Sequence, residues 1–187
     1  KAQSGPPAIV SIELLGDVLD PVDEDGGVAR FRISRDDATD QPLAIKLKTS
    51  GSAKARSDYE VVDDVTGEPV NAKKLTIPAG TADVTLRLVA KDDTRVEGNE
   101  TATFELRPGK TYEVLPGFES ADAVILDNEP VVSIAAIGQI HEDAAEDGVF
   151  RIIRDSIAST DIAVKLKLGG DARLKSDYLL FDTATGD

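Results

Sequence analysis

Residues 29–33 read Ala29-Arg30-Phe31-Arg32-Ile33, and residues 45–48 read Ile45-Lys46-Leu47-Lys48. In both stretches apolar residues alternate with charged ones, which is the period of a β-strand with one buried face and one face in water. Turn signals such as Asp25-Gly26-Gly27 separate further runs of strand length. These runs are Ile9–Leu15, Val28–Ser34, Leu43–Thr49, Lys74–Ile77, Val84–Val89, Thr101–Leu106 and Ala123–Leu126. Seven short strands and no amphipathic helix of three turns predict an all-β, antiparallel β-sandwich.

The composition restricts the classes of function. The chain has 187 residues and a net charge of −14, from 35 acidic and 21 basic side chains. An acidic surface repels nucleic acid and anionic membrane and attracts cations or basic partners. Only 4% of the residues are aromatic, so we expect a core mostly of Val, Ile, Leu and Ala. No apolar run reaches the roughly 18–20 residues that span a bilayer, so direct membrane insertion is not expected.

Motifs for catalysis are missing from the sequence. The chain has no cysteine, which excludes a disulfide framework, a thiolate metal site and a cysteine nucleophile. There is no GxSxG elbow, phosphate-binding glycine loop or nucleophile–base pair. Paired carboxylates could serve a glycosidase, but with three Tyr and five Phe the chain offers little to line a sugar cleft. We therefore do not expect an enzyme.

An internal repeat organises the chain. Motifs near residues 31, 46 and 57 return 119 residues later, and the opening strand returns after a small length difference. The matched pairs are Phe31-Arg32-Ile33 with Phe150-Arg151-Ile152, Lys46-Leu47-Lys48 with Lys165-Leu166-Lys167, Ser57-Asp58-Tyr59 with Ser176-Asp177-Tyr178, and Val10-Ser11-Ile12 with Val132-Ser133-Ile134. A period of this length is that of a domain and not of a solenoid unit. Arg35 and Arg154, which follow matched strands, are expected to form exposed ion pairs of little energetic weight.

The repeat predicts three segments: an N-terminal tail (1–7), one complete domain (8–129) and the first half, about four strands, of a second repeat (130–187). Half a sandwich leaves one apolar face and a row of strand edges uncovered. We therefore expect 131–187 to be completed by a neighbouring repeat or another protein chain, or to be poorly ordered. Mutual completion between two copies would give a homodimer. A proteolysis or fragment boundary is the alternative cause of the truncation.

Acidic residues concentrate at four junctions between predicted strands. They occur in Asp23-Glu24-Asp25, at Asp58, in the run 92–100 and in Asp127-Asn128-Glu129. With Greek-key connections, the turns after the first, third, fifth and seventh strands lie at one end of a sandwich. Carboxylates that converge there repel one another unless a cation neutralises them. The alternative interpretation is that these acidic clusters are simply solvated loop ends, as is usual in an acidic protein.

Calcium suits such a site because it takes about six to eight oxygen ligands in a tolerant geometry. Magnesium requires stricter octahedral placement and keeps more of its water. Zinc and copper prefer His or Cys, and the chain has one histidine, His141, and no thiol.

The run Asp92-Asp93-x-x-x-Glu97-Gly98-x-Glu100-Thr101 resembles the signature of the Calx-β family, the repeat of sodium–calcium exchanger regulatory domains, integrin β4 and many extracellular adhesion proteins. Ser57-Asp58-Tyr59, Ile77-Pro78-Ala79-Gly80 and Ile125-Leu126-Asp127-Asn128 also match the family's motifs. The resemblance covers residues 8–129 and continues as a partial second copy. It implies an immunoglobulin-like β-sandwich in tandem repeats, with Ca²⁺ at one tip in the calcium-binding members.

Carried over position by position, the resemblance implies a set of calcium ligands. The carbonyl of Arg95 falls at a backbone-ligand position, and the side-chain ligands are Glu24, Asp58, Asp92, Asp93, Glu97, Glu100, Asp127 and Glu129. Asn128 departs from the family by replacing the central acid of the terminal triplet, which would weaken or remove one ion. In the second copy, Asp177 matches Asp58 and either Glu142 or Asp143 lies near the Glu24 position, so that copy lacks a complete ligand set.

The first hypothesis is a calcium-binding module of a larger secreted or cell-surface, adhesion-type protein, in which ions order the loops and the junction between repeats. A metal-free structural or adhesion spacer is one alternative. A calcium-sensing, cytoplasmic regulatory segment of a membrane transporter is the other. A cadherin-like module fits the run 92–100 less well.

Overall fold

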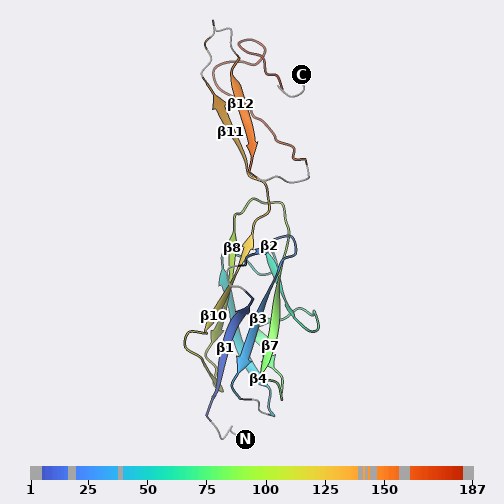
Figure 1. The fold of residues 1–187 in the computed structure, drawn as a ribbon, viewed down its shortest axis with the longest axis vertical. Helices are drawn as coiled ribbons and strands as arrows, with labels where there is room; N and C mark the ends of the chain where they lie inside the picture. The colour runs from blue at the N-terminus through green and yellow to red at the C-terminus, as the bar shows by residue number, and fades with distance from the viewer. Residues whose placement is uncertain are drawn as a thin grey trace. The chain divides into compact units, whose positions relative to one another are not determined.

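The computed structural model describes residues 6–16, 20–37, 40–138, 141, 143, 147–155 and 161–182 (Figure 1). The chain divides into two compact units, Lys1–Arg154 and Asp155–Asp187, and each is described by itself. No helix in the described ranges has the length and apolar character needed to span a membrane. The boundary between repeats near residue 130 is inferred from the internal repeat of the sequence. It differs from this structural division and stays a prediction.

The first unit contains two five-stranded sheets. One has the strand order β5-β7-β3-β1-β9 and the other β2-β10-β8-β4-β6. The strands of the first sheet are β1 (Ala8–Leu15), β3 (Val28–Arg35), β5 (Tyr59–Asp63), β7 (Asp83–Ala90) and β9 (Tyr112–Val114). Those of the second are β2 (Val22–Asp23), β4 (Leu43–Gly51), β6 (Leu75–Ile77), β8 (Glu100–Arg107) and β10 (Ser120–Leu126). All neighbours pair antiparallel except β1 with β9 and β10 with β2.

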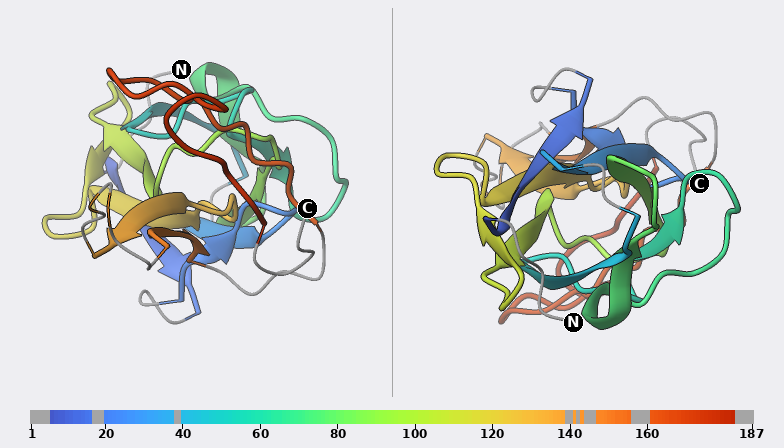
Figure 2. Two further views of the ribbon diagram at one scale, coloured as in Figure 1. Left: turned by 90° about the horizontal axis from the view of Figure 1, so that it is seen from above. Right: turned by 90° about the horizontal axis from the view of Figure 1, so that it is seen from below.

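The two sheets enclose one core, as the end-on views show (Figure 2). Along β3 and β4 the inward residues are buried and the charged ones between them are exposed, which confirms the alternation in the sequence. The centre of this largely aliphatic core is aromatic, because Phe31, Tyr59 and Phe104 are buried there. Phe31 of β3 lies against Phe104 of β8 with ring centroids 4.3 Å apart, and the ring of Tyr59 is 6.1 Å from that of Phe104.

The β-sandwich prediction is confirmed, and all seven predicted strands are present. The sequence reading missed three others, β2, β5 and β9. Two of them have two or three residues, too few to show a period. The third, β5, is a five-residue strand at the edge of its sheet, where it pairs with β7. Short strands such as these are defined by their pairing partners and not by their own pattern.

Arg35 corrects one expectation. Its side chain is 1% exposed and donates hydrogen bonds to the carbonyls of Thr81 (2.9 Å), Gln41 (3.0 Å) and Pro78 (3.3 Å). The strand period explains this burial, because Arg35 is in phase with the inward residues Phe31 and Ile33. Arg35 therefore closes the end of the core. It forms the expected ion pair with Asp37 (3.9 Å), but with its guanidinium buried and not exposed.

The second copy begins with a hairpin of β11 (Val132–Ile137) and β12 (Val149–Arg154). In the described part of residues 155–182, the residues that match β4 and β5 are not in strands. In the first copy these two strands pair with β8 and β7. In the described part of residues 130–187, two strands are thus present, where about four were expected.

Candidate metal centre

Four loops bring acidic side chains to one end of the sandwich. Glu24 follows β2, Asp58 precedes β5, and Asp127 and Glu129 follow β10. The loop between β7 and β8 contributes the run 92–100. Each of these positions lies at a strand terminus or in a loop, so the side chains are held by the ends of both sheets.

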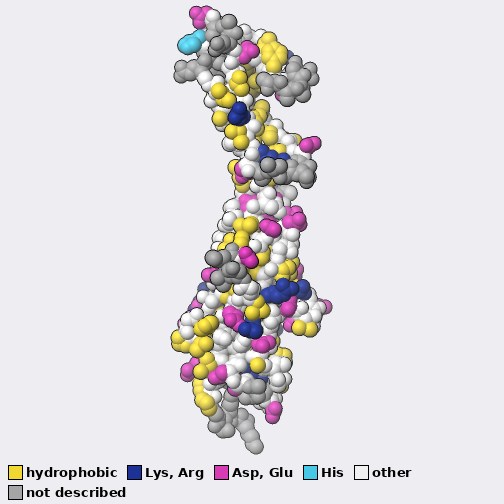
Figure 3. All heavy atoms as spheres, in the orientation of Figure 1, with side chains coloured by type: hydrophobic (Ala, Val, Ile, Leu, Met, Phe, Trp, Pro, Cys, Tyr) yellow, Lys and Arg dark blue, Asp and Glu magenta, His cyan; other side chains and the backbone are white. Residues whose placement is uncertain are grey.

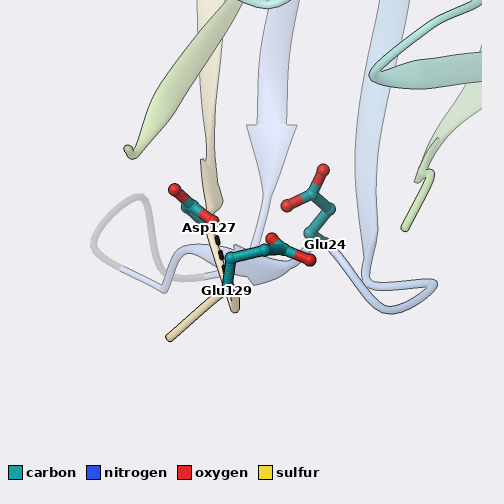
Figure 4. A group of neighbouring side chains, drawn as sticks. All are labelled: Glu24, Asp127 and Glu129. Carbon is teal, nitrogen blue, oxygen red and sulfur yellow. Dashed lines mark hydrogen bonds between the residues drawn. The ribbon is translucent and has the colours of Figure 1, made fainter. Parts of the chain in front are cut away.

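The first acidic group consists of Glu24, Asp127 and Glu129 (Figure 4). One carboxylate oxygen from each lies within 4.8 Å of the others. Glu24 is 7% exposed, and its backbone N–H donates to the carbonyl of Leu126 (3.1 Å), which fixes the loop after β2 to the end of β10. The Oε2 atom of Glu129 is buried and has no hydrogen-bond partner among the described residues. An unpaired buried carboxylate oxygen is costly, and a cation bound there would satisfy it.

A tight turn places Glu24. The backbone N–H of Gly27 donates to the carbonyl of Asp23 (2.8 Å). A Cβ atom added to Gly27 would lie 2.3 Å from that same carbonyl oxygen. Only glycine therefore fits, and the turn keeps the carboxylate of Glu24 close to the end of β10.

Asp127 joins the end of β10 to the β7–β8 loop. Its Oδ2 atom accepts hydrogen bonds from the backbone N–H groups of Glu97 (2.8 Å) and Gly98, and its Oδ1 atom accepts one from Glu129 (3.1 Å). Gly98 has φ +75°, a left-handed conformation that glycine adopts without strain. This geometry lets two successive N–H groups converge on one carboxylate oxygen.

The second acidic group consists of Asp58, Glu97 and Glu100, again with one oxygen from each within 4.8 Å of the others. Asp58 is 7% exposed. Its Oδ2 atom accepts a hydrogen bond from the backbone N–H of Lys54 (2.6 Å), in a turn where Arg56 has φ +85°. The side chain of Glu97 thus belongs to this second group, while its backbone N–H donates to Asp127 of the first group.

The electrostatics divide these acids into two kinds. Burial, a hydrogen bond with Asp58 and the charge of Asp58 raise the pKa of Glu100 to about 7. Burial, a hydrogen bond with Asp127 and the charge of Glu24 raise the pKa of Glu129 to about 7. Burial followed by the charges of Asp93 and Asp127 also raises the pKa of Glu24. These three carboxyl groups resist ionisation first because they are buried, and second because neighbouring carboxylates already concentrate negative charge around them.

Asp58 and Asp127 behave in the opposite way. Burial by itself would raise the pKa of each, but hydrogen bonds to the ionised form outweigh it and lower the pKa of both. The donors are Ser57 and the backbone of Lys54 for Asp58, and the backbone of Gly98 and Glu129 for Asp127. Each acidic group therefore contains one carboxylate that stays ionised and at least one that is held partly neutral.

The remaining predicted ligands belong to neither group. Asp92 accepts a hydrogen bond from the side-chain amide of Asn128 (3.1 Å), and Asp93 accepts one from the backbone N–H of Arg95 (2.7 Å). Both aspartates are near enough to raise the pKa of Glu24. The guanidinium of Arg95 contacts Glu97 (3.1 Å), and no interaction identifies its carbonyl as a ligand. The sequence reading missed the role of Asn128, which ties the end of β10 to Asp92.

In the second copy, the turn around Asp177 repeats that around Asp58. Asp177 accepts from the backbone N–H of Arg173 (2.7 Å), and Lys175 has φ +71°. The turn is thus encoded locally, by the residues that the two copies share. Asp177 belongs to no acidic group among the described residues, and Glu142 lies outside them.

No protein-family model and no curated protein matches the chain. Several solved structures match the chain. The apo form of the Calx CBD1 domain matches with 20% identity and a TM-score of 0.47, over 66% of this chain and 100% of that one. CBD12 from CALX1.2 matches with 22% identity, a TM-score of 0.43 and 58% of this chain, and the calcium binding domain CBD12 of CALX1.1 with 20% identity, a TM-score of 0.44 and 65%. The chain spans 41% and 44% of the length of these two CBD12 structures. Its structural neighbours are thus Calx CBD domains.

Proposed function

We propose that the first sandwich is a calcium-binding module, with Ca²⁺ held at the tip formed by the four acidic loops. The observation that carries this proposal is the pair of acidic groups, each assembled from distant parts of the chain, together with the unpaired buried oxygen of Glu129. Solvated loop ends would be exposed, whereas Glu24 and Asp58 are buried. The ligands are Glu24, Asp58, Asp92, Asp93, Glu97, Glu100, Asp127 and Glu129, with the carbonyl of Arg95.

The donor set favours calcium over other cations. Every side-chain donor is a carboxylate, and no histidine or thiol is present in either group. Hard oxygen donors on four separate loops suit an ion that accepts six to eight ligands at 2.3–2.6 Å with tolerant angles. Magnesium would require stricter, octahedral placement of its ligands.

Bound calcium would act by neutralising the tip. Repulsion among Glu24, Asp93 and Asp127 would be removed, and the loops that carry them would be held together. Since Glu129 directly precedes residue 130 and Asp127 lies two residues before Glu129, the ion would also order the segment that leads into the second copy. The role is binding and mechanical, and no catalytic step is involved.

The kind of parent protein to which this module belongs is a separate part of the proposal. The name of one matched structure refers to a calcium binding domain, which suits the calcium-sensing alternative better than the adhesion-type parent. The extracellular location stays a prediction, as does the homodimer. A metal-free spacer is the competing function. One observation favours it: the hydrogen bonds from Glu97 and Gly98 to Asp127, which we call the Asp127 clamp, already fix the β7–β8 loop without an ion.

Calorimetric titration of the whole chain with Ca²⁺, and with Mg²⁺ at the same concentrations, tests the proposal. Calcium at about 100 times its dissociation constant would add about 2.7 kcal/mol of stability, or roughly 10 °C in Tm for a domain of this size. The double substitution Asp92→Ala/Asp93→Ala should remove the heat and the Tm shift. Asp83→Asn, an exposed acid at the start of β7, is the matched control and should keep both. Flat calorimetry with intact folding in chelator would instead establish the metal-free spacer.

A further inference from the structure

The turn between β2 and β3 contains Asp25-Gly26, one of two Asp-Gly pairs in the chain, the other being Asp147-Gly148. The backbone nitrogen of a glycine attacks the side-chain carboxyl group of a preceding aspartate with little hindrance, because glycine has no Cβ atom. Every other aspartate in the four acidic loops precedes a residue with a side chain. Asp25 is therefore the aspartate at this end of the sandwich that is most open to attack by its own backbone.

The geometry of the turn leaves room for this reaction. Asp25 and Gly26 are both exposed, in contrast to the buried Glu24. A Cβ atom added to Gly26 would have no atom within 4 Å, so the space around the reacting backbone is open. In Figure 4 the chain beyond Glu24 loops away from Asp127 and Glu129 before it enters β3. The carboxylate of Asp25 forms no ion pair within the described ranges, so it can turn toward the Gly26 nitrogen.

Two hydrogen bonds of the closed turn oppose the attack. The backbone N–H of Gly26, whose nitrogen is the attacking atom, donates to the carbonyl of Glu24 (2.6 Å). The backbone N–H of Gly27 donates to the carbonyl of Asp23 (2.8 Å). The Gly26 nitrogen must leave Glu24 before it reaches the carboxyl group of Asp25. The reaction therefore requires a local opening of the turn.

Negative charge favours that opening when no ion is bound. One carboxylate oxygen of Glu24 lies within 4.8 Å of oxygens of Asp127 and Glu129. In Figure 3 acidic side chains are visible at the surface of this end of the sandwich, where Figure 1 labels β2 and β8. Repulsion among these carboxylates pushes outward on the loop that carries Glu24, and a bound cation would remove it. An ion held by Glu24 would thus keep the turn closed.

We propose that Asp25-Gly26 is a site of spontaneous aspartate isomerisation and that bound calcium suppresses it; the second part rests on the proposed function. The Gly26 nitrogen forms a bond to Cγ of Asp25, and the carboxyl hydroxyl group and the amide hydrogen leave together as water. The product is a five-membered succinimide ring. Water then opens the ring at either carbonyl, and opening at the main-chain carbonyl gives isoaspartate. The two steps need no oxidant, reductant or enzyme.

Isoaspartate would disable the tip. Its main chain runs through Cβ and Cγ, so the turn becomes one atom longer. The turn is already tight, because a Cβ atom added to Gly27 would lie 2.3 Å from the carbonyl oxygen of Asp23. The extra atom must therefore displace Glu24, which directly precedes Asp25. Isomerisation would convert a period without calcium into a lasting loss of calcium binding.

Incubation of the whole chain in chelator, and in calcium at about 100 times its dissociation constant, tests the proposal. Peptide mapping with electron-transfer fragmentation distinguishes isoaspartate from aspartate at each site. Isoaspartate should accumulate at Asp25 in chelator but not at Asp122, an exposed aspartate of β10 that precedes alanine. In calcium the rate at Asp25 should fall at least ten-fold, since an ion that binds only the closed turn lowers the open population about 100-fold. The rate at Asp147, which belongs to neither acidic group, should be the same in both solutions.

Asp25→Glu is the matched variant, because it keeps the carboxylate but would have to form a six-membered ring, which closes far more slowly. After incubation in chelator, the calorimetric stoichiometry of calcium binding should fall in the wild type in proportion to the isoaspartate at Asp25. The variant incubated alongside should keep its stoichiometry, and an equal loss in the variant would overturn the link between isomerisation and calcium binding.

The remaining outcomes separate the two parts of the proposal. No isoaspartate at Asp25 in chelator would overturn the modification, whatever calorimetry shows for calcium. Equal rates at Asp25 in calcium and chelator, in a protein that calorimetry shows to bind calcium, would overturn the protection by the ion. An absence of calcium binding would overturn the proposed function and the protection with it, while isomerisation in chelator would stand.

Discussion

The Oδ2 atom of Asp127 lies 2.8 Å from the backbone nitrogen of Glu97, thirty residues earlier in the chain. This hydrogen bond joins the end of β10 to the loop between β7 and β8. It also joins the two acidic groups, because Asp127 belongs to one and Glu97 to the other. A cation bound at either acidic group would therefore act on the β7–β8 loop, which carries Glu97 of one group and is hydrogen-bonded to Asp127 of the other.

Two roles of Asp127 should be separable by mutation: its hydrogen bonds to the β7–β8 loop and its proposed role as a calcium ligand. Asp127→Ala removes both, so the amides of Glu97 and Gly98 should lose hydrogen-exchange protection and calcium affinity should fall. Asp127→Asn keeps a side-chain oxygen that can accept from these amides but removes the charge. We expect protection to be largely retained in chelator and calcium affinity to fall at least ten-fold. Equal loss of protection in both variants would show that the charge, and not the acceptor geometry, holds the loop.

The stability of the calcium-free protein should fall as the pH rises from about 4.5 to above 7. The pKa values of Glu100 and Glu129 are about 7 in the folded protein and 4.5 without the fold. Within that range the folded state binds more protons than the unfolded state, so removing protons favours unfolding. Below about pH 4 the order reverses, because the lowered pKa values of Asp58 and Asp127 mean that the native state loses stabilising charges on acidification.

Urea denaturation in chelator at pH 5, 6, 7 and 8 measures this dependence. Repulsion across the acidic surface contributes a similar slope, so variants are needed to isolate the tip. Glu100→Gln/Glu129→Gln should flatten the profile, whereas Asp83→Asn should leave it unchanged. A profile in the double variant as steep as that of the wild type would mean that the tip carboxyls do not cause it.

The alternation of residues was sufficient to predict the sandwich, because each long strand shows its buried face in the sequence. The same alternation also indicates that Arg35 is buried, because Arg35 is in phase with Phe31 and Ile33. The charge of Arg35, however, suggested an exposed ion pair. The assembly of the acids at one end followed from strand order. Their division into two groups did not, because it depends on backbone geometry: the positive φ of Gly98, the tight turn at Gly27 and the Asn128–Asp92 hydrogen bond.

Arg35 should be essential for stability and irrelevant for calcium. Arg35→Lys keeps the charge but cannot donate to three separate carbonyls, which leaves buried acceptors unpaired. We expect a loss of about 2–3 kcal/mol in the free energy of unfolding from urea denaturation. Arg30→Lys, on the exposed face of the same strand, should change it by less than about 0.5 kcal/mol. Calcium affinity should be unaltered in both, since Arg35 lies at the end of β3 away from Glu24. A small effect at Arg35 would mean that water replaces the guanidinium.

Gly27→Ala should disturb the tip through the backbone alone. The added methyl group would meet the carbonyl oxygen of Asp23 at 2.3 Å, so the turn must open and Glu24 must move away from Asp127 and Glu129. We expect a loss of more than about 1 kcal/mol in stability together with weaker calcium binding by calorimetry. Glu24→Gln separates the two effects: it should weaken calcium binding while stabilising the calcium-free protein, because the raised pKa of Glu24 shows that its charge is unfavourable there. Gly169→Ala, which has no atom within 4 Å of the added Cβ, should change neither property. If Gly27→Ala bound calcium with unchanged affinity, the first acidic group would not require the position that this turn gives Glu24.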